Sequence, residues 1–144
     1  MRTSPAGIDA IKGFEQCVLK TYRCKAGKLT IGWGHTGADV TEGLTWTLEQ
    51  AEAALRQDLV RFENIVSATI KRPLSQGQFD ALVCLSFNIG TDAFRTSTLA
   101  KRFNAGNVQA AGAEFVRWNK VKGRVDPDLL RRRALELWMF ARAS

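Results

Sequence analysis

The apolar residues near the N-terminus recur at helical spacing. They follow Ser4-Pro5, where the serine side chain can cap a helix and proline suits the first helical position. This pattern predicts a helix that ends near Cys17 and carries Glu15 in its last turn. The apolar stripe of this helix consists of Ile8, Ile11 and Phe14.

A longer apolar stripe lies between residues 47 and 67. Thr47 and Gln50 have the spacing of a capping box, in which each of the two side chains satisfies a backbone N–H of the first turn. The pattern predicts an amphipathic helix of about five turns, long enough to join two lobes of the chain. Its apolar face consists of Leu48, Ala51, Leu55, Leu59, Phe62 and Val66.

The second half of the chain is predicted to be helical. Ser75 and Gln78 form another capping box, and the apolar run after them indicates a buried central helix that ends at Gly90. Shorter helices are predicted over residues 94–103 and 108–118, and a last helix begins at Pro127. The core side of this last helix is predicted to consist of Leu130, Ala134, Leu137, Trp138 and Met139.

Between the first two helices the composition changes. Residues 18–37 are rich in glycine, β-branched and aromatic residues, and Lys25-Ala26-Gly27-Lys28 has the composition of a hairpin turn between two short strands. The fold class is therefore α+β, with a small hairpin-bearing lobe at about residues 1–46, a linking helix at about 47–67 and a helical lobe at about 68–144. The length of 144 residues suits a single domain.

Composition and charge narrow the function classes. A hydrophobic fraction of 45% with 24% charged residues is typical of a soluble globular protein, and a net charge of +7 favours a polyanionic partner. Nucleic acid, an anionic membrane and a cell-wall polymer all remain open on charge alone. The arginine run at residues 131–133 is expected to be a solvated helix end, since consecutive helical side chains splay around the axis.

Three cysteines are too few for a disulfide scaffold, and a single histidine leaves little for a metal site, so no metal or other cofactor is predicted. The N-terminus has no long apolar run, so neither a signal peptide nor a stable membrane insertion is expected.

Glu15 is a candidate general acid. Cleavage of a glycosidic bond requires a proton for the leaving oxygen, together with a second group that assists water or attacks the anomeric carbon. Glu15 lies at the end of an apolar helix beside Phe14, and partial burial favours the neutral form of a carboxyl group. A solvated glutamate at a helix end is the alternative interpretation.

The residues after Glu15 carry a more specific pattern. Eight residues separate Glu15 from Cys24, five separate Cys24 from Thr30, and the sequence from Thr30 to Gly37 reads TIGWGHTG. This pattern resembles the phage-type lysozymes, whose motif is Glu, eight residues, Asp or Cys, five residues and Thr. Later segments in the same order also resemble the family: Phe87–Gly90, Ser97–Leu99, Asn104–Gly106, Phe115–Trp118 and Leu130–Arg133.

The resemblance implies a lysozyme-like fold and an endolysin that hydrolyses the β-1,4 bonds between N-acetylmuramic acid and N-acetylglucosamine, causing host lysis. Glu15 would be the general acid, and Thr30 would help to hold the attacking water. The candidate substrate contacts are Phe87, Asn88 and Thr98, although Phe87 could equally be a core residue. The resemblance further implies peptidoglycan rather than nucleic acid as the partner, and a monomer is the default expectation.

Cys24 stands where many members of the family have Asp. As a thiolate it could orient water, stabilise positive charge or attack the sugar; Arg23 and Lys25 flank it and would favour the thiolate. We predict an inverting reaction in which Cys24 holds the water. If Cys24 works as a thiol, a disulfide to another cysteine would inactivate the enzyme. The alternative is three unpaired thiols, with Cys17 and Cys84 simply buried.

His35 is expected to have a structural role, bonding a carboxylate or a backbone group. A cell-wall peptidase or amidase that uses Cys24 and His35 is the competing enzyme class, and a non-catalytic cationic binding module is the other alternative. The resemblance implies an enzyme made in the host cytoplasm that acts on peptidoglycan in the periplasm, with a leader segment or a separate route across the membrane.

Overall fold

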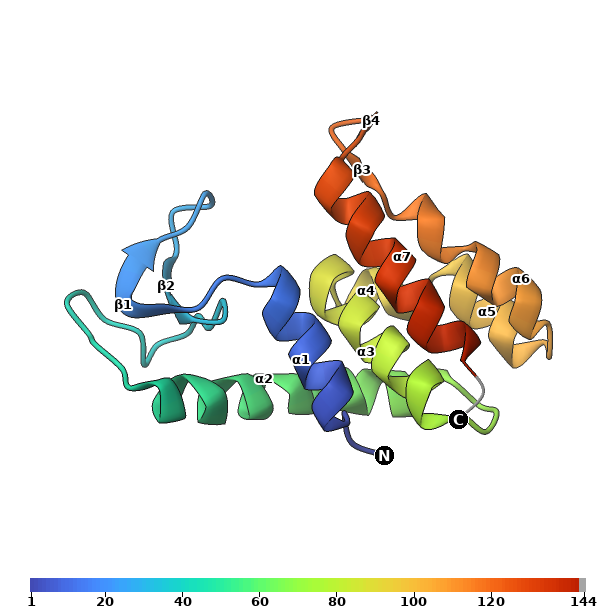
Figure 1. Ribbon diagram of the computed structural model, residues 1–144, viewed down its shortest axis with the longest axis horizontal. Helices are drawn as coiled ribbons and strands as arrows, with labels where there is room; N and C mark the ends of the chain where they lie inside the picture. Colours follow the sequence, from blue (N-terminus) through green and yellow to red (C-terminus); the bar gives the residue numbers. More distant parts are fainter. Residues whose placement is uncertain (143–144) are drawn as a thin grey trace. The chain divides into compact units, whose positions relative to one another are not determined.

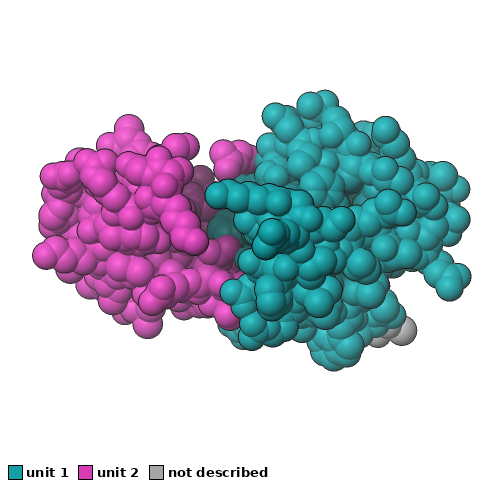
Figure 2. All heavy atoms as spheres, turned by 90° about the horizontal axis from the view of Figure 1, so that it is seen from above, with its two compact units in different colours: residues 1–10, 62–144 teal, residues 11–61 magenta. Residues whose placement is uncertain are grey.

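The computed structural model describes residues 1–142 and groups the chain into two compact units. Unit 1 comprises Met1–Ala10 together with the chain from Phe62 onward, and unit 2 comprises Ile11–Arg61 (Figure 2). Helices dominate and the strands form two small hairpins, which confirms the α+β prediction (Figure 1). Within residues 1–142, no helix combines the length and the apolar character needed to cross a membrane.

Unit 2 contains the predicted hairpin. Helix α1 (Pro5–Phe14) ends within this unit and is followed by the antiparallel strands β1 (Val18–Arg23) and β2 (Leu29–Gly32). Tyr22 pairs with Thr30 and Arg23 with Leu29, so the turn lies where the composition predicted it. Because α1 ends at Phe14, Glu15 follows the last helical residue instead of lying in the last turn, although its N–H still donates to the Ile11 carbonyl at 3.0 Å.

The segment after β2 folds into a tight turn. Gly32 has a φ of +67°, and a Cβ at this position would lie 3.2 Å from the Trp46 ring, so both the backbone and the neighbouring ring favour glycine. Ile31 and His35 then exchange backbone hydrogen bonds of 3.0 and 2.8 Å across the turn. These contacts fix the backbone of the TIGWGH segment.

Helix α2 (Leu48–Thr69) is the predicted long helix, and its first fourteen residues belong to unit 2. Its capping box is confirmed: the Thr47 N–H donates to Gln50 Oε1 at 2.8 Å, and the Gln50 N–H donates to Thr47 Oγ1 at 3.2 Å. The predicted apolar face is buried from Ala51 to Val66, whereas Leu48 is 55% exposed because it lies in the first turn.

Unit 1 is built around α3 (Gln76–Ile89), which begins with the predicted capping box at Ser75 and ends at Gly90. Every side chain from Phe79 to Ser86 is buried, as expected for a central helix. Helix α3 packs along α7 (Pro127–Ala141), while α5 (Thr98–Asn104) packs with α6 (Val108–Ala113) (Figure 1).

Two expectations for the segments between α3 and α7 were wrong, and one element was missed. Residues 94–103 are not one helix but α4 (Thr91–Arg95) and α5 (Thr98–Asn104), because Ser97 caps the second helix through the Ala100 N–H at 3.1 Å. Residues 108–118 form α6 (Val108–Ala113) and a 3₁₀ turn, η1 (Phe115–Arg117). A second hairpin, β3 (Lys120–Val121) and β4 (Arg124–Val125), was not predicted, since its strands are too short to show alternation.

The buried side of α7 differs from the prediction. Arg132 and Arg133 are 4% and 2% exposed, whereas the arginine run was expected to be solvated. Arg133 donates to Glu136 Oε2 at 2.9 Å and to the Trp118 carbonyl at 3.1 Å, so its charge is neutralised inside unit 1. Trp138, which was expected in the core, is 56% exposed, and the buried hydrophobic residues of α7 are Met139 and Phe140.

Candidate functional site

Glu15, Cys24 and Thr30 all belong to unit 2. Glu15 is half-buried at the point where the chain leaves α1. One turn earlier, Lys12 forms an ion pair with Glu52, and its ammonium lies 4.7 Å from the centre of the Trp33 ring. Trp33 is part of the TIGWGH segment, so these contacts link the end of α1 to the segment that follows β2.

Cys24 begins the turn that connects β1 to β2. Its N–H donates to the Lys28 carbonyl at 2.9 Å, and its carbonyl accepts from the Gly27 N–H at 2.8 Å. Hydrogen bonds from the backbone at Lys28 and Ala26, and a weaker one from the Thr30 side chain, lower the pKa of the Cys24 thiol below its ordinary value. The turn therefore favours the thiolate of a half-buried cysteine.

The source of this effect differs from the sequence expectation. Arg23 was expected to favour the thiolate, but its guanidinium donates to the Gly27 carbonyl at 3.0 Å and to Glu42 Oε1 at 2.8 Å. Backbone donors of the turn thus do what a neighbouring cation was expected to do.

Thr30 is positioned by β2 and is only 3% exposed. Its hydroxyl donates to the Lys28 carbonyl at 3.0 Å. A hydroxyl has one proton and two lone pairs, so Thr30 can donate either to this carbonyl or to the Cys24 thiolate, and can still accept a hydrogen bond from water. The structure therefore brings Cys24 and Thr30 together around the Lys28 backbone.

His35 has the structural contacts that the sequence suggested. Its Nδ1 lies 2.8 Å from Asp58 Oδ2, and its Nε2 lies 2.9 Å from Asp39 Oδ2. Burial by itself lowers the pKa of His35, but the two carboxylates outweigh this effect and raise the pKa above its ordinary value. Sequence reasoning did not identify Asp58 as a partner, because Asp58 lies 23 residues further along the chain on α2.

The candidate substrate contacts lie in unit 1, whereas Glu15, Cys24 and Thr30 belong to unit 2. Asn88 is exposed and lines a pocket of about 420 Å³ with Trp118 and Arg117, whereas Phe87 is half-buried with its ring edge against Phe62, at 5.2 Å between centroids. Thr98 is exposed at the start of α5. Trp118, which is half-buried and lines the same pocket as Asn88, was not predicted as a site residue.

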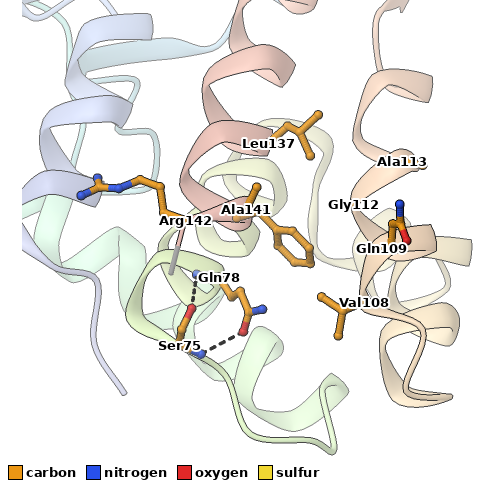
Figure 3. Close-up of a pocket in the computed structure, with 10 residues that line it drawn as sticks. Ser75, Gln78, Val108, Gln109, Gly112, Ala113, Leu137, Ala141 and Arg142 are labelled. Carbon is orange, nitrogen blue, oxygen red and sulfur yellow. Dashed lines mark hydrogen bonds between the residues drawn. The ribbon is translucent and has the colours of Figure 1, made fainter. Parts of the chain in front are cut away.

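Another pocket of unit 1, of about 520 Å³, contains none of the predicted site residues. It lies between α6 and α7, with Val108, Leu137 and Phe140 around it (Figure 3). The guanidinium of Arg142 points away from these apolar side chains in Figure 3 and stacks on Trp138 at 4.4 Å. Among residues 1–142, no group of three or more His, Cys, Asp or Glu side chains is arranged to hold a metal ion.

The chain is similar to known proteins over nearly its whole length. A sequence model described as phage lysozyme matches residues 12–136. The endolysin of Acyrthosiphon pisum secondary endosymbiont phage 1 is 44% identical over 147 residues, which cover 99% of this chain and 100% of that protein.

Two solved structures have the same fold. The muramidase domain of SpmX from Asticaccaulis excentricus gives a TM-score of 0.92 at 38% identity and covers 99% of each chain. A mutant of P22 lysozyme gives a TM-score of 0.89 at 40% identity, covering 97% of this chain and 98% of its own. The predicted lysozyme-like fold is therefore confirmed.

The cysteine peptidase alternative is not supported. Both ring nitrogens of His35 are occupied by carboxylates, so neither is available to accept a proton from Cys24. The relatives are named as endolysins, a muramidase domain and a lysozyme, and none of these names is that of a peptidase. The match to the family over residues 12–136, together with close relatives over the full chain, leads to one conclusion: the chain belongs to the phage lysozyme family.

Proposed function

We propose that Glu15, Cys24 and Thr30 together perform the glycosidic cleavage in this lysozyme. As a member of its family the chain is a glycoside hydrolase that acts on peptidoglycan. The observation that carries the proposal is the turn that holds Cys24 beside Thr30 on the Lys28 backbone, where backbone hydrogen bonds lower the pKa of the thiol and so favour the thiolate at the position of the usual carboxylate.

The proposed reaction proceeds with inversion. Glu15 donates its proton to the glycosidic oxygen as the bond to the anomeric carbon breaks. A water molecule held by the Cys24 thiolate and the Thr30 hydroxyl oxygen attacks the anomeric carbon from the opposite face, and its proton passes to the thiolate. Glu15 is left as a carboxylate and Cys24 as a thiol, and proton exchange with solvent restores both groups.

The Lys28 carbonyl determines how Thr30 takes part. While the Thr30 hydroxyl donates to this carbonyl, at 3.0 Å, its oxygen lone pairs can accept a hydrogen bond from the attacking water. If the hydroxyl turns to the thiolate, it stabilises the anion instead. In both arrangements a lone pair of the hydroxyl oxygen stays available to the water, and Thr30→Val, which lacks the oxygen, removes both contacts.

Several further assignments belong to the same proposal. Phe87, Asn88 and Thr98 bind the glycan. The chain acts as a single lysozyme-like domain and as a monomer. It performs its reaction in the periplasm, where the peptidoglycan of the host lies, and it does not act on nucleic acid.

The test is digestion of purified peptidoglycan with reducing ends as the readout. Glu15→Gln is expected to reduce the rate by at least about a hundredfold, since general acid catalysis contributes about 10² to 10⁴. Cys24→Asp is expected to retain activity, whereas Cys24→Ser loses the anion and most of the rate. Cys84→Ser is the control, because Cys84 is fully buried in unit 1.

The stereochemistry tests the role of Cys24 directly. We expect the α-anomer as the first product of a defined β-linked oligosaccharide, followed by NMR before mutarotation. A first product with retained configuration would replace the held water by a covalent glycosyl-cysteine. Full activity of Glu15→Gln would overturn the whole assignment.

A further inference from the structure

The hairpin β3–β4 presents cations and apolar side chains together to solvent. All six residues from Lys120 to Val125 are exposed, and this segment is called the basic hairpin below. Val121 is 49% exposed and Val125 is 55% exposed, so two apolar side chains of one short hairpin lie in solvent. Figure 1 shows the hairpin beyond the N-terminal end of α7.

In the part of the chain that the structure describes, the cations of the basic hairpin are not paired with acidic side chains. Within residues 1–142, no ion pair includes Lys120, Lys122 or Arg124. The nearest acidic residues in sequence are otherwise engaged: Asp126 accepts hydrogen bonds from the Asp128 and Leu129 N–H groups, and Asp128 pairs with Arg131. The hairpin therefore keeps three uncompensated positive charges.

The register distributes these side chains in a particular way. Lys120 pairs with Val125, and Val121 pairs with Arg124, so each face of the hairpin carries one valine and one cation. Lys122 and Gly123 form the tip with φ values of 51° and 79°, as in a two-residue type I′ turn. The turn gives the hairpin a fixed shape, and an apolar group lies beside a positive charge on both faces.

We infer that the basic hairpin docks this lysozyme on an anionic lipid bilayer. The valines enter the boundary between headgroups and acyl chains, while the long cationic side chains extend to lipid phosphates. A soluble polyanion would satisfy the cations but would give no environment for two exposed valines, and this favours a bilayer over a wall polymer or nucleic acid. Each basic residue near such a surface strengthens binding about fivefold.

The inference does not rest on the proposed reaction, because its test measures lipid binding and not glycan cleavage, although Lys120 and Val121 also line the pocket that contains Asn88. Docking would be peripheral and reversible, since two valines and three cations bind far less strongly than a spanning helix. It would concentrate the enzyme at the face of the membrane that adjoins the wall.

The experiment is vesicle co-flotation of the full chain. We would compare phosphatidylcholine vesicles with vesicles of equimolar phosphatidylcholine and phosphatidylglycerol, and check the fold of each variant by circular dichroism. Two variants separate the contributions: Val121→Ser with Val125→Ser keeps the charge, and a triple variant neutralises the cations. The triple variant is Lys120→Gln, Lys122→Asn and Arg124→Gln, with Asn at the positive-φ position.

A matched control removes the same charge elsewhere in unit 1. This control variant is Lys71→Gln, Arg72→Gln and Lys101→Gln, at three exposed positions outside the hairpin. Should the hairpin triple variant fail to fold, Lys122→Asn alone tests the same point, with an expected loss of about fivefold.

We expect binding to the phosphatidylglycerol vesicles only. The hairpin triple variant should bind about a hundredfold more weakly, the valine variant about tenfold more weakly, and the control triple less than about threefold more weakly. Binding of wild type to neutral vesicles as strong as to anionic ones overturns the inference. So does a valine variant that binds like wild type, which indicates a general polyanion patch, or a control triple that loses as much as the hairpin triple.

Discussion

The ion pairs of His35 allow a quantitative prediction about stability. Asp58 bonds His35 Nδ1 at 2.8 Å, and the side chains of His35 and Asp58 are 15% and 28% exposed, so water screens the pair only in part. Asp39 bonds Nε2 at 2.9 Å, but its side chain is 65% exposed. The two carboxylates therefore hold the same ring at similar distances and differ mainly in exposure.

This difference in exposure determines the expected magnitudes. Hydrogen bonds to charged groups contribute about 1.5–3 kcal/mol when shielded, whereas exposed ion pairs contribute about 0–1 kcal/mol. At about pH 5.5, below the histidine pKa of about 6.5 in an unfolded chain, Asp58→Asn should lower the free energy of unfolding by about 2 kcal/mol. Asp39→Asn, the matched control, should lower it by less than about 1 kcal/mol.

The pH dependence follows from the direction of the pKa shift. The pKa of His35 is raised in the folded protein, so the stability gained from its charged form is fully present below the unfolded pKa. This stability is lost as the pH rises through the folded pKa. At about pH 9 the difference between wild type and Asp58→Asn should fall to about 1 kcal/mol, the contribution of a neutral hydrogen bond.

Urea unfolding followed by circular dichroism measures these free energies, and NMR titration measures the pKa. The chain has one histidine, so the imidazole signal needs no assignment. A histidine that titrates at or below the ordinary value would refute the reasoning. Equal losses for Asp58→Asn and Asp39→Asn, or a loss at Asp58 that does not change with pH, would refute it as well.

Three further predictions concern Cys24, Glu136 and Gly32. Iodoacetamide should alkylate Cys24 selectively, because the turn lowers the pKa of its thiol while burial raises the pKa values of Cys17 and Cys84. The labelling rate should rise through an apparent pKa below the ordinary thiol value, which mass spectrometry after a pH series measures. Faster labelling of Cys17 would contradict this prediction. Glu136→Ala should lower the free energy of unfolding by about 3–5 kcal/mol, because it leaves Arg133 buried without a counter-charge, and Glu136→Ala with Arg133→Met should recover much of the loss. Gly32→Ala should lower the free energy of unfolding by about 1–2 kcal/mol, because alanine is strained at a φ of +67°, and thermal unfolding measures this. The control is Gly13→Ala, which should leave the free energy of unfolding unchanged. Gly13 has an ordinary helical conformation and no atom near its Cβ position.

Local patterns account for what the sequence predicted well. The capping boxes at Thr47 and Ser75 and the apolar face of α2 are interactions between residues a few positions apart, so they can be read directly from the sequence. The spacing of Glu15, Cys24 and Thr30 is likewise a property of one short segment, and it indicated the family before any distance was known. The position of the first hairpin followed from its turn composition for the same reason.

Contacts between distant segments account for what the sequence missed. Arg132 and Arg133 carry charged side chains, so the sequence alone indicates that they are exposed. Their burial becomes favourable only because α7 packs on α3 and Glu136 lies beside them. The partner of His35 lies on α2, and no local pattern indicates it. A lowered pKa of Cys24 was expected from neighbouring cations, but its cause is the direction of backbone N–H groups in a turn, which exists only once the chain is folded. The sequence determined the two long helices, the first hairpin and the family motif, while the tertiary structure alone decided which charges are buried, which are paired and which remain exposed on the basic hairpin.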